Sequence, residues 1–381
     1  MLTPAIIQKF TEIKTPFYYY DLELLKKTLS AAKKEVDKYG FHLHYAFKAN
    51  CTSEILKTIH TFGLGADCVS GNEVKCAIEN GYASEHIVFA GVGKSDDEIN
   101  YALDQDIFCF NSESLQELEV INELATQKNK IAKIALRLNP NVDAYTHKYI
   151  TTGLEENKFG INAHELDKVL ALLKRLKNLK LTGLHFHIGS QITDLNPFRK
   201  LCTKVNEFTT LMEQKGIHLE HINVGGGLGI NYKEPDTEAI PDFESYFKIF
   251  HEMIKLRKGQ ELHFELGRAL VANCGSLISR VLYIKNGINT NFAILDAGMT
   301  ELIRPALYQA YHKIENLSSN SDSYKKYDVV GPICESSDCF GKAVDLPETK
   351  RGDLIAIRST GAYGEVMASN YNLREKAHSV F

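Results

Sequence analysis

Residues 42–50 read His42-Leu43-His44-Tyr45-Ala46-Phe47-Lys48-Ala49-Asn50 and have the alternation of a β-strand. Leu43, Tyr45 and Phe47 share one face, while the other face ends on a single lysine, Lys48, before a turn of small residues. A lysine at the end of a strand is usually a solvated charge. Whether Lys48 is a reactive group therefore depends on the partners that the rest of the chain supplies.

The strand at residues 42–48 is the first of eight segments of the same kind, and a stretch with helical periodicity separates each from the next. The other expected strands are residues 65–70, 87–91, 107–111, 133–139, 181–189, 221–227 and 262–268. This alternation predicts an α/β fold with a parallel sheet, and eight repeats favour closure into a (β/α)8 barrel of the TIM type. An open doubly wound sheet has the same alternation and stays an alternative.

The pattern changes after residue 275, where short strands separated by Gly, Pro and Asn turns are expected. These strands are residues 277–284, 291–296, 327–330, 354–359 and 377–381. The strand expected at residues 17–20 precedes the first barrel helix and is assigned to the same part. The sequence thus predicts a barrel domain at residues 22–275 and a β-rich domain, sandwich-like or barrel-like, made of residues 1–21 and 276–381.

Composition argues against several classes of function. The chain has 381 residues, a formal net charge of −4 and no long basic run, which disfavours nucleic-acid binding. Its 8 cysteines are scattered without a zinc-ligand spacing, so we expect no metal site and reduced thiols in a cytoplasm. No secretory signal is recognisable, and no apolar run approaches the length of a membrane span, so we expect no membrane partner.

Catalytic groups of β/α barrels stand at the C-terminal ends of the strands. The strand ends of this chain supply an amine at Lys48, a carboxylate at Asp67, an imidazole at His187 and a second carboxylate at Glu265. By alternation, the side chains of Lys48, His187 and Glu265 can all point into the mouth of the barrel. Such a combination is a candidate active site.

A glycine run, Gly225-Gly226-Gly227, follows the seventh strand, and Gly267-Arg268 follows the eighth. Backbone N–H groups of successive glycines can approach a phosphate closely, and barrels often bind phosphate with the loops after these two strands. A phosphate site beside an inward lysine suggests pyridoxal phosphate held as a Schiff base. Glu265 would then keep the pyridine nitrogen protonated, and His187 could lie flat against the ring.

Each of these residues also has a purely structural interpretation. His187 alone would be a hydrogen-bonded core histidine, and a glycine run is often only a turn. His185 and His187 could instead form a metal pair, as in barrel metal hydrolases. Cys334 would by default be a small buried hydrophobe. The conjunction of these groups at strand ends favours the cofactor site.

Several motifs resemble the fold type III pyridoxal-phosphate decarboxylases, whose barrel is like that of alanine racemase. They are Tyr45-Ala46-Phe47-Lys48-Ala49-Asn50, Gly65-Ala66-Asp67-Cys68-Val69-Ser70-Gly71, His185-Phe186-His187-Ile188-Gly189-Ser190, Gly225-Gly226-Gly227 and Glu265-Leu266-Gly267-Arg268. Others resemble the diaminopimelate decarboxylase family in particular. They are Asn139 through Thr146-His147, Thr151-Thr152-Gly153, Asn157-Lys158-Phe159-Gly160-Ile161, Arg304-Pro305-Ala306-Leu307-Tyr308, Cys334-Glu335-Ser336 and Gly361-Ala362-Tyr363-Gly364. The resemblance covers nearly the whole chain in order.

The resemblance implies a role for each matching residue. Lys48 would form the internal aldimine with pyridoxal 5'-phosphate, Glu265 would face the pyridine nitrogen, and His187 would stack on the ring. The cofactor-binding residues would be Lys48, Asp67, His187, Ser190, Gly225, Gly226, Gly227, Glu265, Gly267, Arg268 and Tyr363. The substrate-binding residues would be Arg268, Arg304, Tyr308, Glu335 and Tyr363.

The resemblance also implies the reaction and the assembly. The enzyme would convert meso-2,6-diaminopimelate to L-lysine and carbon dioxide, the last step of lysine biosynthesis. Cys334 would protonate Cα after carbon dioxide leaves. In the family, Cys334 and Glu335 come from the partner subunit, so a homodimer is implied. Arginines suit the retained carboxylate of this substrate because they bind carboxylates in a bidentate way.

Two features depart from the family pattern, and several rival functions remain. Leu266 stands where the family usually has proline, and the chain stops earlier than many relatives. The closest rival is a decarboxylase of ornithine, arginine or carboxynorspermidine, whose substrates lack the second α-amino acid end. More distant rivals are an amino-acid racemase, a metal-dependent barrel hydrolase built on His185 and His187, and a non-catalytic pyridoxal-phosphate carrier.

Overall fold

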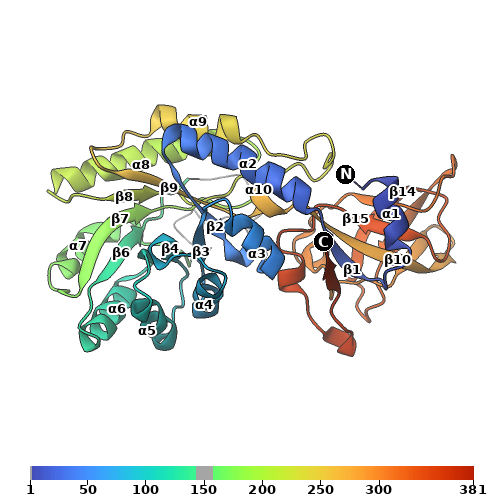
Figure 1. Cartoon of the computed structure of the whole chain (residues 1–381), viewed down its shortest axis with the longest axis horizontal. Coiled ribbons are helices and arrows are strands. Elements are labelled where there is room, and N and C mark those ends of the chain that lie inside the picture. The colour runs from blue at the N-terminus through green and yellow to red at the C-terminus, as the bar shows by residue number, and fades with distance from the viewer. Residues whose placement is uncertain (1, 143–157) are drawn as a thin grey trace. The chain divides into compact units, whose positions relative to one another are not determined.

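The computed structural model describes residues 2–142 and 158–381, so the motif residues Thr146, His147, Thr151, Thr152, Gly153 and Asn157 lie outside the described part. The chain forms two compact units (Figure 1). The barrel unit consists of Thr28–Gly229 and Asp242–Gly267. The β-rich unit consists of Met1–Lys27, Ile230–Pro241 and Arg268–Phe381. The domain boundaries expected from the sequence, at residues 21/22 and 275/276, placed residues 230–241 in the barrel domain, whereas in the structure they belong to the β-rich unit.

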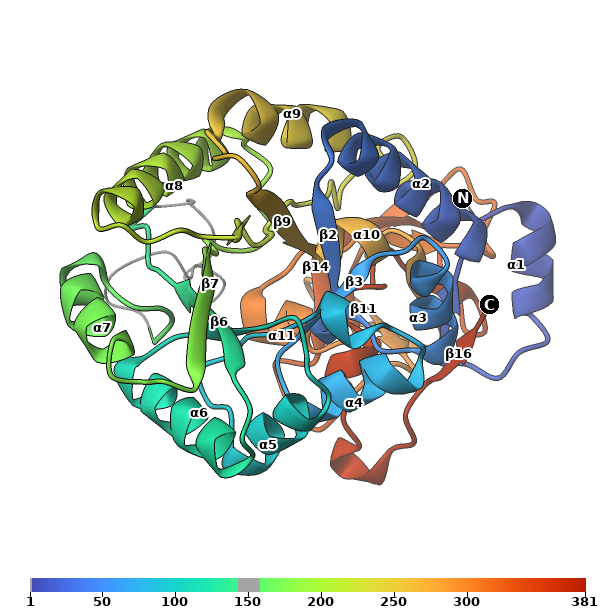
Figure 2. The ribbon, with the colours of Figure 1, turned by 60° about the vertical axis from the view of Figure 1, so that its left-hand side comes forward.

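Within residues 2–142 and 158–381, eight parallel strands close into a barrel in chain order. They are β2 (His42–Ala46), β3 (Gly65–Cys68), β4 (Ile87–Phe89), β5 (Cys109–Ser112), β6 (Ala132–Arg137), β7 (Leu179–His185), β8 (His221–Asn223) and β9 (Glu261–Leu266). The first and last strands, β2 and β9, pair with each other from His42↔His263 to Tyr45↔Leu266, which closes the barrel (Figure 2). The predicted (β/α)8 barrel is therefore confirmed, and the open doubly wound sheet is excluded.

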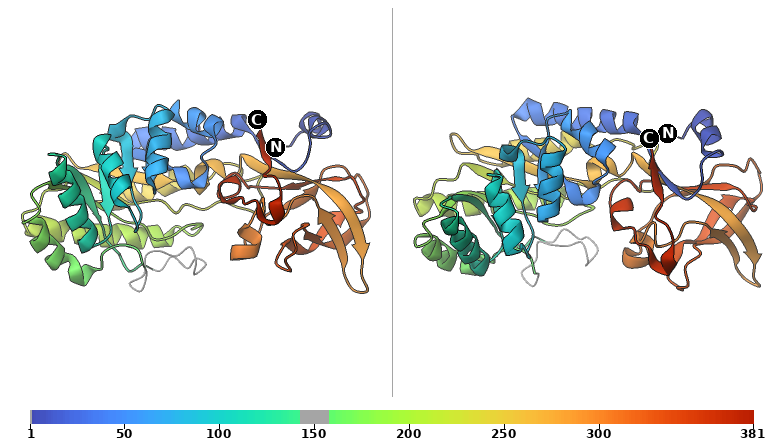
Figure 3. Two further views of the ribbon diagram at one scale, coloured as in Figure 1. Left: turned by 90° about the horizontal axis from the view of Figure 1, so that it is seen from below. Right: turned by 60° about the horizontal axis from the view of Figure 1, so that its bottom comes forward.

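Helices connect the strands and lie outside them (Figures 2 and 3). They are α2 (Leu22–Tyr39), α3 (Ser53–His60), α4 (Gly71–Glu79), α5 (Asp96–Asp104), α6 (Leu115–Gln127), α7 (Leu166–Leu173), α8 (Asn196–Gln214) and α9 (Phe243–Met253). Serines begin three consecutive helices, α4, α5 and α6, because the side chains of Ser70, Ser95 and Ser114 accept hydrogen bonds from backbone N–H groups of the first turn. These caps fix where each βα-loop ends and its helix starts.

Strands β2 and β7 end earlier than expected from the sequence, which corrects the placement of two predicted site residues. β2 stops at Ala46, so Lys48 lies in a 3₁₀ turn, η1 (Phe47–Ala49), rather than in the strand. β7 stops at His185, which leaves His187 in the following loop. The reason is that β2 pairs with β3 only as far as Ala46↔Asp67, and beyond this point the chain turns toward its helix. Of the four groups predicted at strand ends, Asp67 and Glu265 lie within their strands.

Histidines fill the inside of the barrel at the end where the strands begin. His44, His221 and His263 are all buried there. Burial lowers the pKa of His44 to about 3 and that of His221 to about 4, so both rings are neutral near pH 7. Gly183 makes room for one ring, since a Cβ at this position would lie 2.6 Å from His221 Cδ2. Packing in this layer thus depends on a glycine facing an imidazole.

The β-rich unit is built on a sheet with the strand order β12-β15-β10-β11-β13-β14. Its strands are β1 (Phe17–Tyr20), β10 (Gly275–Asn286), β11 (Asn291–Leu295), β12 (Ile314–Asn316), β13 (Tyr324–Val330), β14 (Cys339–Pro347), β15 (Leu354–Ile357) and β16 (His378–Val380). Its helices are α1 (Pro4–Phe10), α10 (Arg268–Val271) and α11 (Arg304–Tyr308). β1 pairs with β10 and β16, so the N-terminal strand joins the C-terminal sheet as expected from the sequence.

Two strands of this sheet were not expected. β12 spans only Ile314–Asn316, and β14 contains Gly341 and has no clear alternation. Both form because a neighbour offers unpaired backbone: β15 pairs with β12, and β13 pairs with β14. The short 3₁₀ helices elsewhere are η2 (Ser84–His86), η3 (Ala163–Glu165), η4 (Glu365–Met367) and η5 (Tyr371–Leu373). In the described residues, no helix has the length and apolar character needed to cross a bilayer.

We predict that Gly183→Ala destabilises the barrel unit by about 1–3 kcal/mol, because the new methyl group overlaps the ring of His221 in a packed layer. Thermal denaturation monitored by circular dichroism measures the effect. The double variant Gly183→Ala/His221→Ala should recover part of the loss. Gly93→Ala is the matched control, because a Cβ there meets nothing within 4 Å. Equal midpoints for Gly183→Ala and Gly93→Ala would contradict the prediction.

Candidate active site

The amine of Lys48 is held by a buried carboxylate at the end of β3. Lys48 Nζ lies 3.2 Å from Asp67 Oδ2, and the Lys48 side chain keeps 39% of its surface exposed while Asp67 has none. Burial and the nearby charge of Glu265 raise the pKa of Asp67 to about 6, although Lys48 itself lowers it. The first and second strand ends thus hold a reachable amine against a carboxyl group that titrates near neutrality.

Glu265 carries a buried carboxylate that is held by side chains from three other barrel strands. Its Oε1 accepts hydrogen bonds from Asn111 Nδ2 at 3.1 Å and from Asn223 Nδ2 at 2.6 Å, and its Oε2 lies 3.0 Å from His185 Nε2. Burial alone would raise the pKa of Glu265, but His185, Lys48 and His187 outweigh burial and hold it below its usual range. Glu265 is therefore an ionised carboxylate inside the barrel.

Asn111, His185 and Asn223, which bind Glu265, were not predicted as site residues. They come from β5, β7 and β8, so only the closed barrel brings them to β9. The sequence signal that could have identified His185 was its alternation with His187, but this alternation suggested a metal-binding pair. The observed contacts separate the two rings, because His185 binds Glu265 whereas His187 Nδ1 accepts a hydrogen bond from the N–H of Gly226 at 3.3 Å.

The glycine run is required by close packing of backbones. A Cβ at Gly226 would overlap the carbonyl oxygen of Glu265, and a Cβ at Gly227 would lie 2.6 Å from the carbonyl oxygen of Gly189. Gly225 and Gly227 also have positive φ values of 67° and 111°. The loop after β8 therefore lies flush against the loop after β7 and the end of β9. Ser190, which follows Gly189, is half-buried in that first loop.

Two arginines meet at one tyrosine in the β-rich unit. Arg268 Nη1 donates to the hydroxyl of Tyr232 at 2.6 Å, and Arg304 Nη1 donates to the same oxygen at 2.9 Å. Burial alone would raise the pKa of Tyr232, but the two guanidinium groups outweigh burial and lower it. The guanidinium of Arg268 also stacks 4.9 Å from the ring centre of Tyr363. The predicted residues Arg268, Arg304 and Tyr363 thus share one cluster.

Arg304 is buried without an ion-pair partner among the carboxylates of the described residues. Besides Tyr232, Arg304 has a neutral hydrogen-bond partner: its Nη1 donates to His312 Nε2 at 3.0 Å, and burial with the charge of Arg304 lowers the pKa of His312 to about 3. A buried cation of this kind is costly unless an anion reaches it. Tyr232 and His312 were missed by sequence analysis, because neither belongs to a motif. Tyr308 is half-buried on α11, the helix that begins with Arg304.

Cys334 and Glu335 lie on an exposed loop of the β-rich unit. This corrects the default interpretation of Cys334 as a buried hydrophobe, because its side chain is exposed. The loop is held by the carboxylate of Asp338, which accepts hydrogen bonds from the N–H of Met299 at 2.6 Å and from the N–H of Ile333 at 2.7 Å. Glu335 Oε1 accepts a hydrogen bond from the hydroxyl of Tyr371 at 2.8 Å.

Known proteins show which family has this sequence. The family model described as pyridoxal-dependent decarboxylase, pyridoxal binding domain, matches residues 22–272. A diaminopimelate decarboxylase of Bacteroides thetaiotaomicron is 60% identical over 370 residues, which cover 97% of this chain and 96% of that protein. The chain belongs to the diaminopimelate decarboxylase family. The resemblance seen in its motifs is thereby confirmed.

Other members of the diaminopimelate decarboxylase family agree in sequence and in fold. A diaminopimelate decarboxylase of Aquifex aeolicus is 40% identical and covers 96% of this chain and 86% of its own length. The crystal structure of diaminopimelate decarboxylase from Helicobacter pylori complexed with L-lysine has a TM-score of 0.92 and 40% identity, and covers 98% of this chain and 93% of that one. A lysine decarboxylase of Selenomonas ruminantium, at 20% identity and a TM-score of 0.88, shows the shared fold alone.

As a pyridoxal-dependent decarboxylase, the chain uses pyridoxal 5'-phosphate, and the barrel residues fit this cofactor. A carboxylate offers roughly four acceptor positions. As far as the described residues go, Glu265 Oε1 has two donors and Oε2 has one, so Oε2 can accept a further N–H, such as that of a protonated pyridine. Asp67 Oδ1 and Ser112 Oγ are buried without a hydrogen-bond partner in the same described residues, so both atoms can still form hydrogen bonds inside the barrel.

We predict a pH-dependent effect of Asp67→Asn on the stability of the cofactor-free protein. Because its folded pKa is raised to about 6, the Asp67 carboxyl contributes stability that is present near pH 4 and lost as the pH rises through 6. Asn cannot titrate, so the variant should gain about 1–3 kcal/mol relative to wild type between pH 4 and pH 7.

Thermal midpoints at a series of pH values measure this difference. Asp97→Asn, at an exposed position on α5, is the matched control and should track the wild type at every pH. A constant offset between Asp67→Asn and wild type over the whole range would contradict the assigned direction of the Asp67 pKa shift.

Proposed function

We propose that this chain decarboxylates meso-2,6-diaminopimelate to L-lysine and carbon dioxide with pyridoxal phosphate, as the last step of lysine biosynthesis. The observation that carries the proposal is the buried cationic cluster in which Arg304 and Arg268 meet at Tyr232, because Arg304 faces no carboxylate of the described chain. A substrate with a second amino-acid end supplies such a carboxylate, whereas ornithine and arginine do not. Bidentate binding by guanidinium suits that group.

The barrel residues would hold the cofactor by their ordinary chemistry. Lys48 would hold the aldehyde carbon through its amine, and the loops that contain Ser190, residues 225–227 and residues 267–268 would bind the phosphate through backbone N–H groups. Glu265, kept ionised by its donors, would hold a proton on the pyridine nitrogen. His187 would lie against the ring face. Pyridoxal phosphate supplies the electron sink for the bond that breaks at Cα.

The substrate would be oriented by its distal end, which the reaction does not change. Arg304, Arg268 and Tyr308 would bind the distal carboxylate, Glu335 the distal ammonium group, and Tyr363 would contact both cofactor and substrate. The carboxylate that leaves needs a place without a tight positive clamp, because stabilising its charge in the ground state would slow its departure. Asp67 would keep the Lys48 amine in place between turnovers.

Cys334 would deliver the proton that replaces carbon dioxide at Cα. We propose that Cys334 and Glu335 serve the active site of a partner subunit in a homodimer. Two features support this role: both side chains are exposed, and Asp338 fixes the loop that carries them. A rigid exposed loop can enter a neighbouring subunit at little cost in entropy.

The proposal extends to domains and to location in the cell. Residues 22–275 would form the cofactor-binding domain, and residues 1–21 with 276–381 would contribute the substrate and dimer contacts. The reaction would take place in the cytoplasm, where the reduced thiol of Cys334 persists. No nucleic acid or membrane takes part.

We predict that the purified protein is yellow, releases carbon dioxide from meso-diaminopimelate, and is linked to its cofactor at Lys48 by borohydride. Peptide mass spectrometry locates the linkage. Lys48→Ala should lose the linkage and nearly all turnover, because no other amine replaces the one held by Asp67. Lys57→Ala, an exposed lysine on α3, is the control and should retain both. Release from L-ornithine but not from diaminopimelate would move the function to the rival decarboxylases.

We predict that Cys334→Ala keeps the cofactor absorbance and loses about 10²–10⁴-fold in turnover, as expected for a missing proton donor. Mixing equal amounts of Lys48→Ala and Cys334→Ala subunits should restore about a quarter of wild-type activity, because each mixed dimer of a two-fold assembly regains one intact site. Either inactive parent alone is the control. Absence of recovery after verified subunit exchange would place Cys334 in its own subunit's site.

A further inference from the structure

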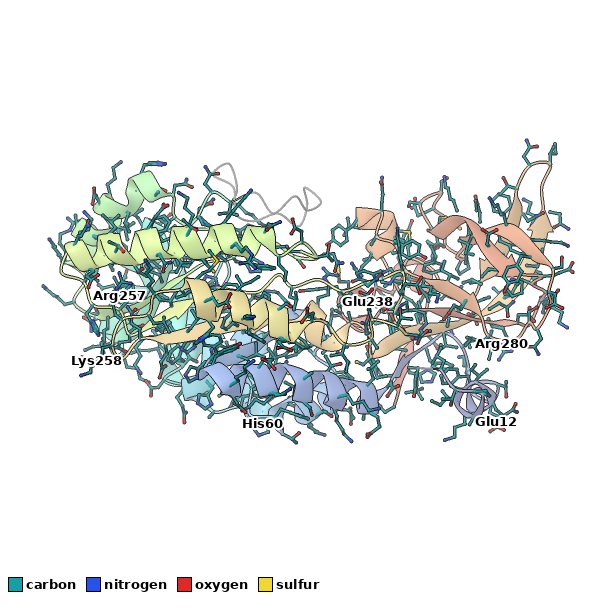
Figure 4. The ribbon with its side chains drawn as sticks, turned by 90° about the horizontal axis from the view of Figure 1, so that it is seen from above. Glu12, His60, Glu238, Arg257, Lys258 and Arg280 are labelled. Carbon is teal, nitrogen blue, oxygen red and sulfur yellow. The ribbon has the colours of Figure 1, made fainter. Side chains whose placement is uncertain are left out.

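A second group of polar side chains lies at the opposite end of the barrel from Lys48. His42 is the first residue of β2, and Glu261 is the first residue of β9, with His263 two residues further on. Glu261 follows the loop that contains Arg257 and Lys258, which are labelled in Figure 4. One nitrogen or oxygen atom from each of His42, Glu261 and His263 lies within 4.8 Å of the others.

Hydrogen bonds on one side of this group fix where the protons of His263 are. The carbonyl oxygen of His86 lies 3.1 Å from His44 Nδ1, so Nδ1 carries the proton and His44 Nε2 accepts. His263 Nδ1 lies 2.9 Å from His44 Nε2 and must therefore donate to it. In a neutral ring the other nitrogen, His263 Nε2, is then an acceptor.

His263 Nε2 faces another acceptor. It lies 3.3 Å from Glu261 Oε2, and His42 Nε2 lies 3.7 Å from the same oxygen. Two lone pairs at this distance repel each other unless a positive centre lies between them. A proton on His263 would remove the repulsion, but it would place a charge on a buried ring. A cation bound by all three side chains also removes the repulsion, and its charge then lies beside the half-exposed Glu261 and His42, where the Glu261 carboxylate partly neutralises it.

We propose that His42, Glu261 and His263 form a site for a divalent transition-metal ion, best suited to zinc. Two imidazole nitrogens and one carboxylate oxygen are ligands that zinc prefers, and its remaining positions can be filled by water. His42 and Glu261 are 47% and 53% exposed, so solvent reaches the site.

His44 acts in this site as a positioning residue. Metal-binding histidines usually donate their second ring N–H to a fixed acceptor, which sets the tautomer and raises the basicity of the ligand nitrogen. The pair His263 Nδ1–His44 Nε2, continued to the carbonyl of His86, has this arrangement. Gly65 allows it, since a Cβ there would lie 2.9 Å from His44 Cε1.

The site would join the two strands that close the barrel. His42 and His263 are direct neighbours in the pairing of β2 with β9, the first and last barrel strands. An ion held by both strands favours the folded barrel over the unfolded chain by mass action. Its role would be structural, because decarboxylation with pyridoxal phosphate requires no metal.

The test uses the full-length holoenzyme, stripped with a chelator and dialysed against zinc chloride, with bound metal measured by mass spectrometry. We expect about one zinc ion per wild-type chain and a thermal midpoint several degrees higher with zinc than without. His42→Ala and Glu261→Gln should lower zinc affinity at least tenfold while leaving decarboxylation unchanged. The double variant His218→Ala/Glu220→Gln removes the same residue types from exposed positions nearby, so it should bind zinc like the wild type.

One further measurement tests the proton assignment without metal. In zinc-free protein at pH 8, Glu261→Gln should raise the thermal midpoint, because the new amide can donate to His263 Nε2 where the carboxylate could only repel it. A lower midpoint would mean that a protonated His263 already pairs with Glu261, and this would overturn the proposal. Wild-type protein that takes up no zinc, or variants that bind zinc as well as wild type does, would overturn it too.

Discussion

The buried carboxylate of Glu265 is the group on which the rest of the structure depends. An ionised carboxylate inside a barrel costs several kcal/mol unless donors surround it. Here the donors are Asn111, His185 and Asn223, which stand on three different strands. Each must face inward at the right height, so the charge of Glu265 specifies the register of β5, β7, β8 and β9 together. A slip of one residue in any of these strands would turn its donor outward and leave the charge uncompensated.

Much of this arrangement could be predicted from the sequence, because strand alternation is a local property. Alternation located all eight barrel strands and predicted that Glu265 faces the barrel interior. It failed where the outcome depends on distant parts of the chain. The donors to Glu265 become neighbours only after closure, and Tyr232 lies in a loop without a motif. β14 likewise follows from its pairing with β13 rather than from its own residues.

The site residues show the same limit in finer detail. Lys48 and His187 were predicted within strands, yet both lie just beyond them, in turns whose position depends on where the neighbouring strand stops pairing. The glycine run was predicted as a phosphate loop, and the structure adds a packing reason that is independent of any ligand, since a side chain at Gly226 would overlap the backbone of β9. The exposure of Cys334 could not be derived from its sequence neighbours, which are ordinary loop residues.

The segment Ile230–Pro241 leaves the barrel unit between β8 and α9 and returns to it. It carries Tyr232 to the arginine cluster and Asp236 to an ion pair with Arg358 at 2.8 Å. Neither unit is therefore a continuous piece of polypeptide. Expressing either unit alone would separate residues 230–241 from their contacts. Exchanging one unit for that of a distant homologue by a single crossover would do the same. Laboratory chimaeras that exchange one unit therefore need matched junctions around residues 230 and 241 as well.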